Sequence, residues 1–434
     1  MLGKASVGIG LLGMGVVGGG VVRALFEKDQ QLTGLIGCPV TLQGVLVRDL
    51  DKQRSYDQVR DLLTVDAEGI LNNPDVDIVV EVMGGEDPAL DYILKSITHR
   101  KHVVTANKEV MARHGERILS LAREKGVRVL FEASVAGATP IIAPLLRDLV
   151  ANEILAIRAI INGTTNYILT RMANEGADFT ATLEEAKDLG YAEADPTNDI
   201  EGIDAAYKLA ILATLAFRST VKDTDVYREG ITRLAARDFL YAKELGYAIK
   251  LLAIAGKQDG AIQVRVHPVF VPEGTMLAKV GGVLNAVDVE TDLAGRVFFH
   301  GRGAGSMPTT SAILADVVDV ARNVAGGVLL QPSPAFSESL RVRPIQELET
   351  RYYLRLDVAD RPGVLAQIAM VLGDLGISIA SVIQKETDEV AHQAEIVLMT
   401  HRAMEASMER AIEALEGLKD VRQVGNLVRV EEFE

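Results

Sequence analysis

The chain has a single cysteine, Cys38, among its 434 residues. One cysteine excludes an intramolecular disulfide framework and is typical of proteins kept in a reducing cytosol. No run of about 18 uninterrupted apolar residues is present, which excludes a membrane-spanning helix. Residues 7–22 are apolar but hold seven glycines, and no charged n-region beyond Lys4 and no small-residue cleavage site accompany them. We therefore expect no signal peptide and a cytoplasmic location.

Basic residues are also scarce: 45 Lys and Arg stand against 60 Asp and Glu, for a formal net charge of -15. Phosphate backbones need clustered positive charge, so a nucleic-acid partner is excluded. The seven histidines lack a metal-binding spacing such as HExxH, and no catalytic zinc is expected. With 48% hydrophobic and 24% charged residues, the chain has an ordinary globular composition long enough for two or three domains.

In the first third of the chain, short apolar runs alternate with amphipathic stretches. The runs that predict strands are residues 5–13, 40–48, 77–85, 102–108 and 127–134. The stretches that predict the helices between them are residues 20–28, 88–99 and 115–126. Such alternation indicates a parallel sheet covered on both faces. The fold class is therefore α/β, beginning with a Rossmann-like dinucleotide-binding domain over residues 1–133.

Two further domains are expected. Residues 134–323 combine longer helices with β-rich runs and predict a second, mixed α+β domain that ends in a helix near 309–323. The predicted helices are residues 140–151, 164–175, 182–190 and 200–217, and the β-rich runs are residues 261–271 and 295–303. Residues 324–350, with GG and PSP, predict a linker. Residues 351–434 follow the order strand, helix, strand, strand, helix, strand, which predicts a ferredoxin-like fold.

The segment GMGVVG lies between a predicted strand and a predicted helix, which strengthens an otherwise weak glycine motif. The first glycine permits a tight turn, the second lets a pyrophosphate approach the backbone, and the third lets helix and strand pack closely. The cofactor-binding residues predicted here are Gly13, Gly15, Val16, Val17 and Gly18. After the second strand, Arg48 favours the 2′-phosphate of NADP and Asp49 favours the 2′-hydroxyl of NAD. This leaves the preference open, leaning to NADP, unless both are solvated loop charges.

Residues 192–208, AEADPTNDIEGIDAAYK, gather five carboxylates before an apolar run. Asp199 or the residue before it can cap a helix that begins near Ile200. On that helix Asp204 and Lys208 share the apolar face at steps of three and four, so they point inward. They are either an ordinary ion pair or part of a site for a polar, charged small molecule.

The stretch 186–208 resembles the signature of homoserine dehydrogenases, with its GYxE, DPxxD and GxD patterns and the closing lysine. Other stretches similar to that family are TANK (105–108), FEASVAGATP (131–140) and INGTTNYIL (161–169). The resemblance extends from residue 6 to about residue 323 and implies that the mixed α+β domain, residues 134–323, is the catalytic and dimerisation domain. The C-terminal module, residues 351–434, resembles an ACT regulatory domain. It implies NAD(P)H-dependent interconversion of L-aspartate 4-semialdehyde and L-homoserine, in threonine, methionine and isoleucine biosynthesis.

The resemblance also implies residue roles. Lys208 becomes the general acid and base for the substrate oxygen, and Glu193 and Asp204 become ligands of the substrate ammonium and hydroxyl groups. Asp199 either orients this network or only caps the helix. Lys108 is expected close to the nicotinamide and the substrate, the alternative being an exposed loop lysine. The GRGAG amides of Gly303 and Gly305 are expected to close over the cofactor.

A monovalent cation, typically sodium, is implied by the same family resemblance. Its ligands in this chain would be the Glu132 side chain and the carbonyls of Val135, Gly137 and Thr139. From its residues alone the segment is an ordinary loop of small residues, which suits carbonyl oxygens turned towards a hard cation.

The ACT-like module is expected to sense an end product, L-threonine, or only to dimerise the enzyme as a homodimer or homotetramer. DRPG, residues 360–363, lies between its first strand and helix, with Pro362 fitting the first helical position. One rival is a phosphorylating semialdehyde dehydrogenase, which needs a cysteine nucleophile. Cys38 precedes the second strand, far in sequence from the catalytic edge. The other rival is a non-catalytic amino-acid sensor, which would not need Lys108 and Lys208 together with the glycine turn.

Overall fold

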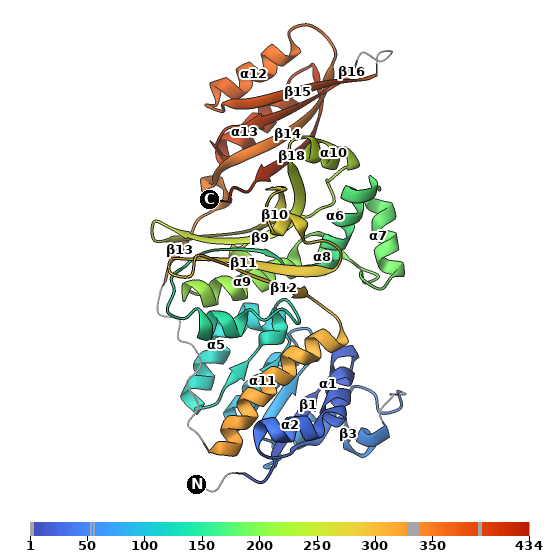
Figure 1. The fold of residues 1–434 in the computed structure, drawn as a ribbon, viewed down its shortest axis with the longest axis vertical. Coiled ribbons are helices and arrows are strands. Elements are labelled where there is room, and N and C mark those ends of the chain that lie inside the picture. The colour runs from blue at the N-terminus through green and yellow to red at the C-terminus, as the bar shows by residue number, and fades with distance from the viewer. Residues whose placement is uncertain (1–3, 53, 55–56, 328–338, 389–392, 434) are drawn as a thin grey trace. The chain divides into compact units, whose positions relative to one another are not determined.

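The computed structural model describes residues 4–52, 54, 57–327, 339–388 and 393–433 (Figure 1). The chain forms two compact units. The first unit takes residues 1–155, 207–225 and 285–340, and the second takes residues 156–206, 226–284 and 341–434. Of the predicted linker, residues 324–350, the stretch 328–338 lies outside the described residues. The described part holds the last residues of helix 306–326, the short strand 341–342 and the start of strand 349–359.

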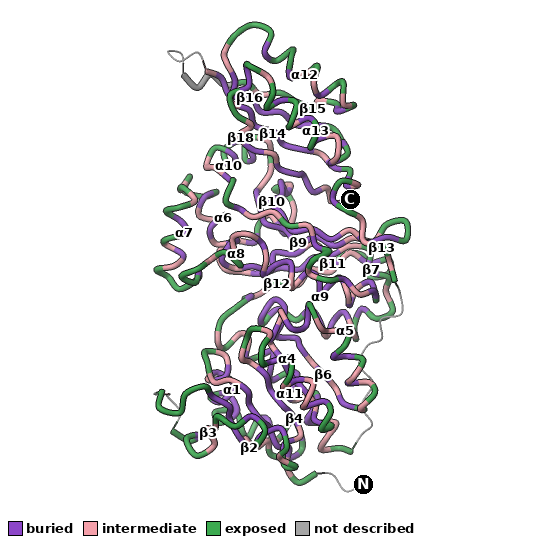
Figure 2. Tube along the Cα trace, turned by 180° about the vertical axis from the view of Figure 1, so that it is seen from behind, coloured by how far each residue is buried: buried purple, intermediate pink, exposed green. Residues whose placement is uncertain are grey.

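The first unit contains the predicted parallel sheet, and its strand order is β3-β2-β1-β4-β5-β6. The strands are β1 (Val7–Leu12), β2 (Val40–Leu46), β3 (Leu63–Thr64), β4 (Ile78–Glu81), β5 (His102–Thr105) and β6 (Val129–Leu130). Every neighbouring pair is parallel, and β1 is buried along its whole length. The neighbouring strand β4, labelled in Figure 2, is buried along its whole length as well. Because parallel strands end at one edge of a sheet, the turns after β1, β4, β5 and β6 share that edge.

Helices join these strands and cover the sheet. They are α1 (Val16–Glu27), α2 (Asp29–Ile36), α3 (Ala67–Leu71), α4 (Ala89–Thr98), α5 (Lys108–Lys125) and, from much later in the chain, α11 (Ser306–Gly326). α1 and α11 lie side by side (Figure 1), and Val21 and Leu25 share one hydrophobic core with Ile313 and Val317. The helix expected to end the second domain near 309–323 therefore packs in the first unit, which also takes in nearly all of β11 (Leu284–Thr291) and the whole of β12 (Arg296–Arg302).

The second unit is built on β9 (Tyr247–Gln258) and β10 (Ala261–Pro272), a long antiparallel pair, with most of β7 (Ile154–Ile160) beside β9. Its helices are α6 (Gly163–Glu175), α7 (Phe179–Asp188), α8 (Thr197–Ile200) and α10 (Ala236–Glu244), and α9 (Ile203–Phe217) begins there and continues in the first unit. The short strands β8 (Tyr227–Arg228) and β13 (Arg341–Val342) pair with β10.

The C-terminal module confirms the predicted order of strands and helices. It comprises β14 (Glu349–Ala359), α12 (Val364–Asp374), β15 (Ile379–Asp388), β16 (Gln393–Thr400), the short β17 (Ala403–Met404), α13 (Glu405–Glu416) and β18 (Val421–Val430). The sheet order is β18-β14-β16-β15, and both helices pack on it through residues such as Ile368 and Met408. β18 also pairs with β10, so this sheet continues that of the second unit.

Two local predictions are wrong. The helix expected from near Ile200 is interrupted, because Gly202 has a left-handed φ of 73° and α9 starts only at Ile203. Asp199 lies inside the short helix α8 and does not cap α9. Pro362 is not at the first helical position, since α12 begins at Val364. In the part of the chain that the structure describes, no helix is both long and apolar enough to span a membrane.

Candidate active site

The glycine turn between β1 and α1 has the geometry that its spacing predicts. Gly13 has a left-handed φ of 102°, and a Cβ on Gly18 would lie 2.1 Å from the carbonyl oxygen of Gly13. Gly15 is the N-cap of α1, and a Cβ there would meet nothing within 4 Å. The first and third glycines are therefore required by the fold itself, whereas the second faces open space at a helix N-terminus, where backbone N–H groups attract phosphate.

The residues around the turn complete a dinucleotide-binding edge. Val16 and Val17 form the first turn of α1, and the Ser306 hydroxyl at the start of α11 donates to the Val16 carbonyl at 2.8 Å. Arg48 is exposed just beyond the end of β2, which also receives the N–H of Gly13 through the Leu46 carbonyl at 3.1 Å. The Arg48 side chain thus lies at the strand end where the adenosine ribose is bound in folds of this type.

Lys108 is the first residue of α5, directly after β5, and its position is set by a buried hydrogen-bond chain. The Glu81 carboxylate accepts from the Thr105 hydroxyl at 2.6 Å and from the Met83 N–H at 2.8 Å. The Thr105 oxygen accepts from the Asn107 N–H at 3.0 Å, and the Asn107 side chain caps α5. Burial raises the pKa of Glu81, while these donors favour its ionised form. One carboxylate therefore ties the loops after β4 and β5 together.

The loop after β6 is folded around Glu132. One oxygen of its carboxylate accepts the N–H groups of Ile141 at 2.6 Å and Ile142 at 2.9 Å, and the other accepts that of Ala143 at 2.6 Å. The predicted cation ligands Val135, Gly137 and Thr139 are all buried in this loop. Within the described residues, no three His, Cys, Asp or Glu side chains come together as a metal site.

The GRGAG segment lies against this loop. The Arg302 carbonyl accepts from the Ala138 N–H at 3.0 Å, and a Cβ on Gly137 would lie 2.3 Å from the carbonyl oxygen of Gly303. Gly303 is buried, whereas Gly305 is exposed, has a φ of 118° and is the N-cap of α11. Of the two predicted cofactor-binding glycines, Gly305 therefore stands at a helix N-terminus beside α1, and Gly303 packs on the loop after β6.

In the second unit, an asparagine joins two of the predicted substrate carboxylates. Asn162 donates from its Nδ2 to Asp199 Oδ1 at 2.6 Å and to Asp204 Oδ2 at 3.0 Å. Asp204 is 3% exposed, and Asp199 is half-buried. The motif INGTTNYIL had drawn attention to this segment, but no role for Asn162 followed from it. The sequence signal that could have singled out Asn162 is its place directly before a predicted helix, where asparagine is typical of an N-cap.

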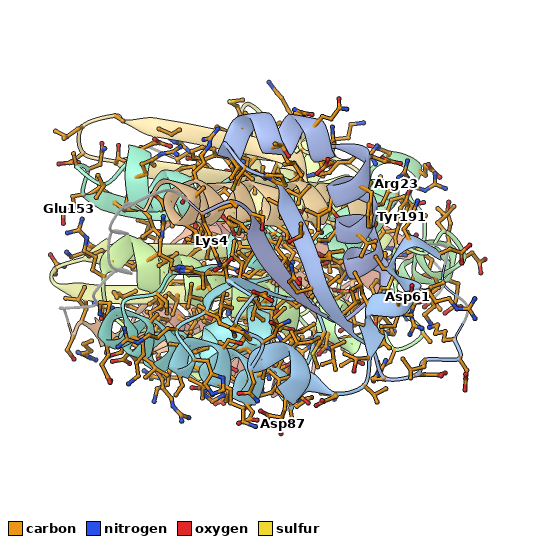
Figure 3. The ribbon with its side chains drawn as sticks, turned by 90° about the horizontal axis from the view of Figure 1, so that it is seen from below. Lys4, Arg23, Asp61, Asp87, Glu153 and Tyr191 are labelled. Carbon is orange, nitrogen blue, oxygen red and sulfur yellow. The ribbon has the colours of Figure 1, made fainter. Side chains whose placement is uncertain are left out.

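Glu193 is not among the carboxylates that Asn162 holds. It is exposed and follows Tyr191, whose carbonyl accepts the Thr164 hydroxyl at 2.6 Å. The Tyr191 ring, labelled in Figure 3, packs against Tyr167 with ring centroids 5.0 Å apart. These contacts anchor the segment that carries Glu193 to the start of α6.

Lys208 lies one turn after Asp204 on α9, and its side chain is half-buried. Beyond it the helix is lined by buried residues such as Leu212 and Leu215. Leu209 and Ala213, on other faces of the helix, are equally buried, whereas Tyr207 and Lys208 on the predicted inward face are only half-buried, so burial does not single out that face. Cys38 is 6% exposed in the hydrophobic core before β2, so it has neither the exposure nor the position of a nucleophile.

A parallel sheet with this glycine turn, with a lysine and a loop of buried carbonyls at its carboxyl edge, defines the class of the protein. It is an oxidoreductase that binds a nicotinamide dinucleotide on a Rossmann-like domain. Family descriptions agree: residues 13–132 match the NAD-binding domain of homoserine dehydrogenase, residues 140–318 match homoserine dehydrogenase, and residues 352–420 match the ACT domain.

Individual relatives are similar over the whole chain. The homoserine dehydrogenase of Synechocystis sp. is 44% identical, covering 98% of this chain and 99% of its own length, and that of Corynebacterium glutamicum is 43% identical, covering 98% and 96%. The crystal structure of a homoserine dehydrogenase from Thiobacillus denitrificans has a TM-score of 0.91 at 41% identity and covers 100% of both chains. A hyperthermophilic archaeal homoserine dehydrogenase in complex with NADPH covers 73% of this chain and 97% of its own, with a TM-score of 0.62 at 26% identity. The chain belongs to the homoserine dehydrogenase family.

Proposed function

We propose that Lys208 is the proton-transfer group in the interconversion of L-aspartate 4-semialdehyde and L-homoserine. Hydride added to the aldehyde carbon leaves an alkoxide, which must take up a proton, and the reverse reaction must remove one. The observation that carries this proposal is the buried Asp204, held by Asn162, one helical turn before a half-buried Lys208. Asp204 and Glu193 bind the hydroxyl and ammonium groups of the substrate, and Asp199 orients Asp204 through their shared amide.

The pyrophosphate of the cofactor is bound by the turn from Gly13 to Gly18, with Gly305 beside the cofactor and Lys108 near its nicotinamide. NADPH is the preferred cofactor, because Arg48 is exposed at the ribose end of the turn and offers a cation to a 2′-phosphate. Support comes from the archaeal relative, whose structure contains NADPH. The cofactor supplies the hydride, and the protein supplies orientation and the proton.

A monovalent cation in the loop after β6 fits the donor set there, although the Glu132 carboxylate fits it less well than the carbonyls do. Both Glu132 oxygens already accept backbone N–H groups. The carbonyls of Val135, Gly137 and Thr139 are oxygen ligands of the kind that hard cations prefer, and the buried Thr139 hydroxyl has no hydrogen-bond partner. When bound, the cation would fix the loop on which Gly303 packs.

The ACT module is a sensor for L-threonine in this proposal, and a dimerisation module alone is the alternative. A pocket of about 450 Å³ is lined by the DRPG segment, residues 360–363, together with Val364, Leu365 and Gln384. Its size suits one amino acid, and the backbone amides at the start of α12 suit a carboxylate. We also propose a homodimer or homotetramer in the cytoplasm.

The test is steady-state kinetics of the full chain with aspartate semialdehyde and either NADPH or NADH, with and without millimolar L-threonine. Consumption of NADPH, with slower turnover when threonine is present, is the expected result. Absence of turnover with both NADPH and NADH would refute the proposed reaction. Turnover that ignores threonine, with no heat of threonine binding in calorimetry, would leave the module as a dimerisation unit.

A further inference from the structure

The Asn162 amide is fixed in one orientation by helix α6. Its Oδ1 accepts the N–H of Thr165 at 2.9 Å and the Thr165 hydroxyl at 3.0 Å, as the N-cap of that helix. A backbone N–H can only donate, so the oxygen of the amide must face Thr165 and its NH2 group must face away. Asn162 is 5% exposed, so these protein contacts and not solvent orient its amide.

The NH2 group then meets two carboxylates at once. Its contacts with Asp199, at 2.6 Å, and Asp204, at 3.0 Å, use both of its hydrogens. Hydrogens about 120° apart place the two accepting oxygens roughly 5 Å from each other. Like charges at that distance, one of them buried, would move apart or take up a proton if no donor lay between them.

The two partners come from different segments. Asp199 lies in α8 and Asp204 in the first turn of α9, and Gly202 makes the left-handed turn between them. The separation of the carboxylates is therefore not set by one rigid helix. Asn162 bonds to both carboxylates, and its own position is set by α6.

We propose that Asn162 is a positioning residue for substrate: its amide oxygen caps α6, and its NH2 group holds the carboxylates of Asp199 and Asp204 at a fixed separation. The proposal rests on the assignment of Asp204 to the homoserine site. Asn162 therefore contributes to the binding of homoserine through the two carboxylates, and it does not contribute to the binding of the dinucleotide.

Two variants separate the role of Asn162 as the N-cap of α6 from its contact with Asp199 and Asp204. Asn162→Asp keeps the shape and the cap acceptor but replaces the NH2 group by a carboxylate oxygen, which repels both partners. Asn162→Ser keeps a cap acceptor and has no group that reaches two carboxylates. Asp178→Ser is the matched control, because Asp178 caps α7 through Thr180 at 2.8 Å, is exposed and has no such partners.

The expected result is a split between substrates. Both Asn162 variants should raise the KM for homoserine by about tenfold or more while leaving the KM for the oxidised nicotinamide within about twofold. Asn162→Ser should lose more thermal stability than the Asp178→Ser control, because Asp199 and the buried Asp204 lose a hydrogen-bond donor, so the difference between the two KM values carries the test. In an Asp204→Asn background, Asn162→Ser should raise the KM for homoserine little further, because the buried carboxylate that Asn162 holds is already gone.

Three outcomes would overturn the proposal. An unchanged KM for homoserine in both variants would show that Asn162 does not position Asp199 and Asp204 for the substrate. Equal losses for homoserine and nucleotide, with a matching drop in thermal stability, would reduce Asn162 to a structural cap. Fully additive effects with Asp204→Asn would show that Asn162 acts elsewhere. Failure of the proposed function is separate, since it appears in the wild-type enzyme as absence of homoserine turnover.

Discussion

Two glycines of the same turn should respond differently to replacement by alanine: Gly18→Ala should lose stability, and Gly15→Ala should lose cofactor affinity. A Cβ on Gly18 would lie 2.1 Å from the Gly13 carbonyl oxygen, where ordinary contact begins near 3.4 Å, so strand and helix must part by about 1.3 Å. Such overpacking costs about 1–3 kcal/mol of stability. A Cβ on Gly15 meets no protein atom within 4 Å, and its φ of -84° suits alanine.

Gly15→Ala should therefore fold with a change of at most about 1 kcal/mol, the scale of an N-cap substitution. Its methyl group occupies the approach of the pyrophosphate, and we expect a 10–100-fold loss of cofactor affinity, about 1.4–2.7 kcal/mol. In thermal unfolding, a cofactor concentration of 100 Kd stabilises wild type by about 2.7 kcal/mol, and the variant by only about 0.4–1.4 kcal/mol.

The control for both is Gly34→Ala in α2, where a Cβ also meets nothing and no cofactor is expected. It should keep the full cofactor shift and gain slightly in stability. A full cofactor shift in Gly15→Ala would refute the assignment of that glycine to the pyrophosphate. Wild-type stability of Gly18→Ala would refute the packing argument.

Three other changes test separate parts of the molecule. Lys208→Ala should lower kcat by roughly 10²–10⁴-fold with nearly unchanged cofactor binding, and a rate above about a tenth of wild type would exclude the proton-transfer role. Arg48→Ala should raise the KM for NADPH more than that for NADH, and equal changes would place Arg48 outside the phosphate pocket. Lys250, buried on β9 with its Nζ donating to the Val280 carbonyl at 2.6 Å, has a pKa that burial lowers to about 8. Its proton is bound more tightly in the unfolded chain, so stability should rise between about pH 8 and 10.5 by up to about 3 kcal/mol. Urea unfolding at pH 7.5 and 10 should show a smaller rise for Lys250→Met, and an equal rise would refute the assignment.

Long periodic elements were predictable because each is specified by its own residues. The five longer runs of the first third all became strands of the parallel sheet, and the GMGVVG turn lies where its flanking pattern placed it. Short elements such as α3 and β3 carry too few residues for a period to show. The sequence also located α11, but not its packing against α1, which depends on residues nearly 300 positions apart, as in the bond between Ser306 and Val16.

The candidate site shows the same division. Asp204 and Lys208 were placed on one face because a helical period relates them. The break at Gly202, with its left-handed φ of 73°, was missed because the helical period of the residues after it was extended back to Ile200, although a glycine in a polar stretch is a breaker signal. Asn162 was missed as well, since its partners lie 37 and 42 residues away and only the fold brings them together.

The role of Glu132 is where the family resemblance and the geometry differ most. The resemblance implies that the Glu132 side chain binds a cation. In the structure its two oxygens already accept hydrogen bonds from three backbone N–H groups, those of Ile141, Ile142 and Ala143. In Glu132→Gln one oxygen becomes an NH2 group, which cannot accept, so at least one of these buried N–H groups loses its partner. A loss of that kind costs about 1–3 kcal/mol.

This cost should be the same in sodium chloride and in choline chloride if the carboxylate only shapes the loop. Urea unfolding of wild type and Glu132→Gln in the two salts measures it without reference to activity. Sodium should stabilise both proteins to the same extent, because the carbonyls of Val135, Gly137 and Thr139 remain in the variant. Stabilisation by sodium that is present in wild type and absent in Glu132→Gln would show instead that the carboxylate itself binds the cation.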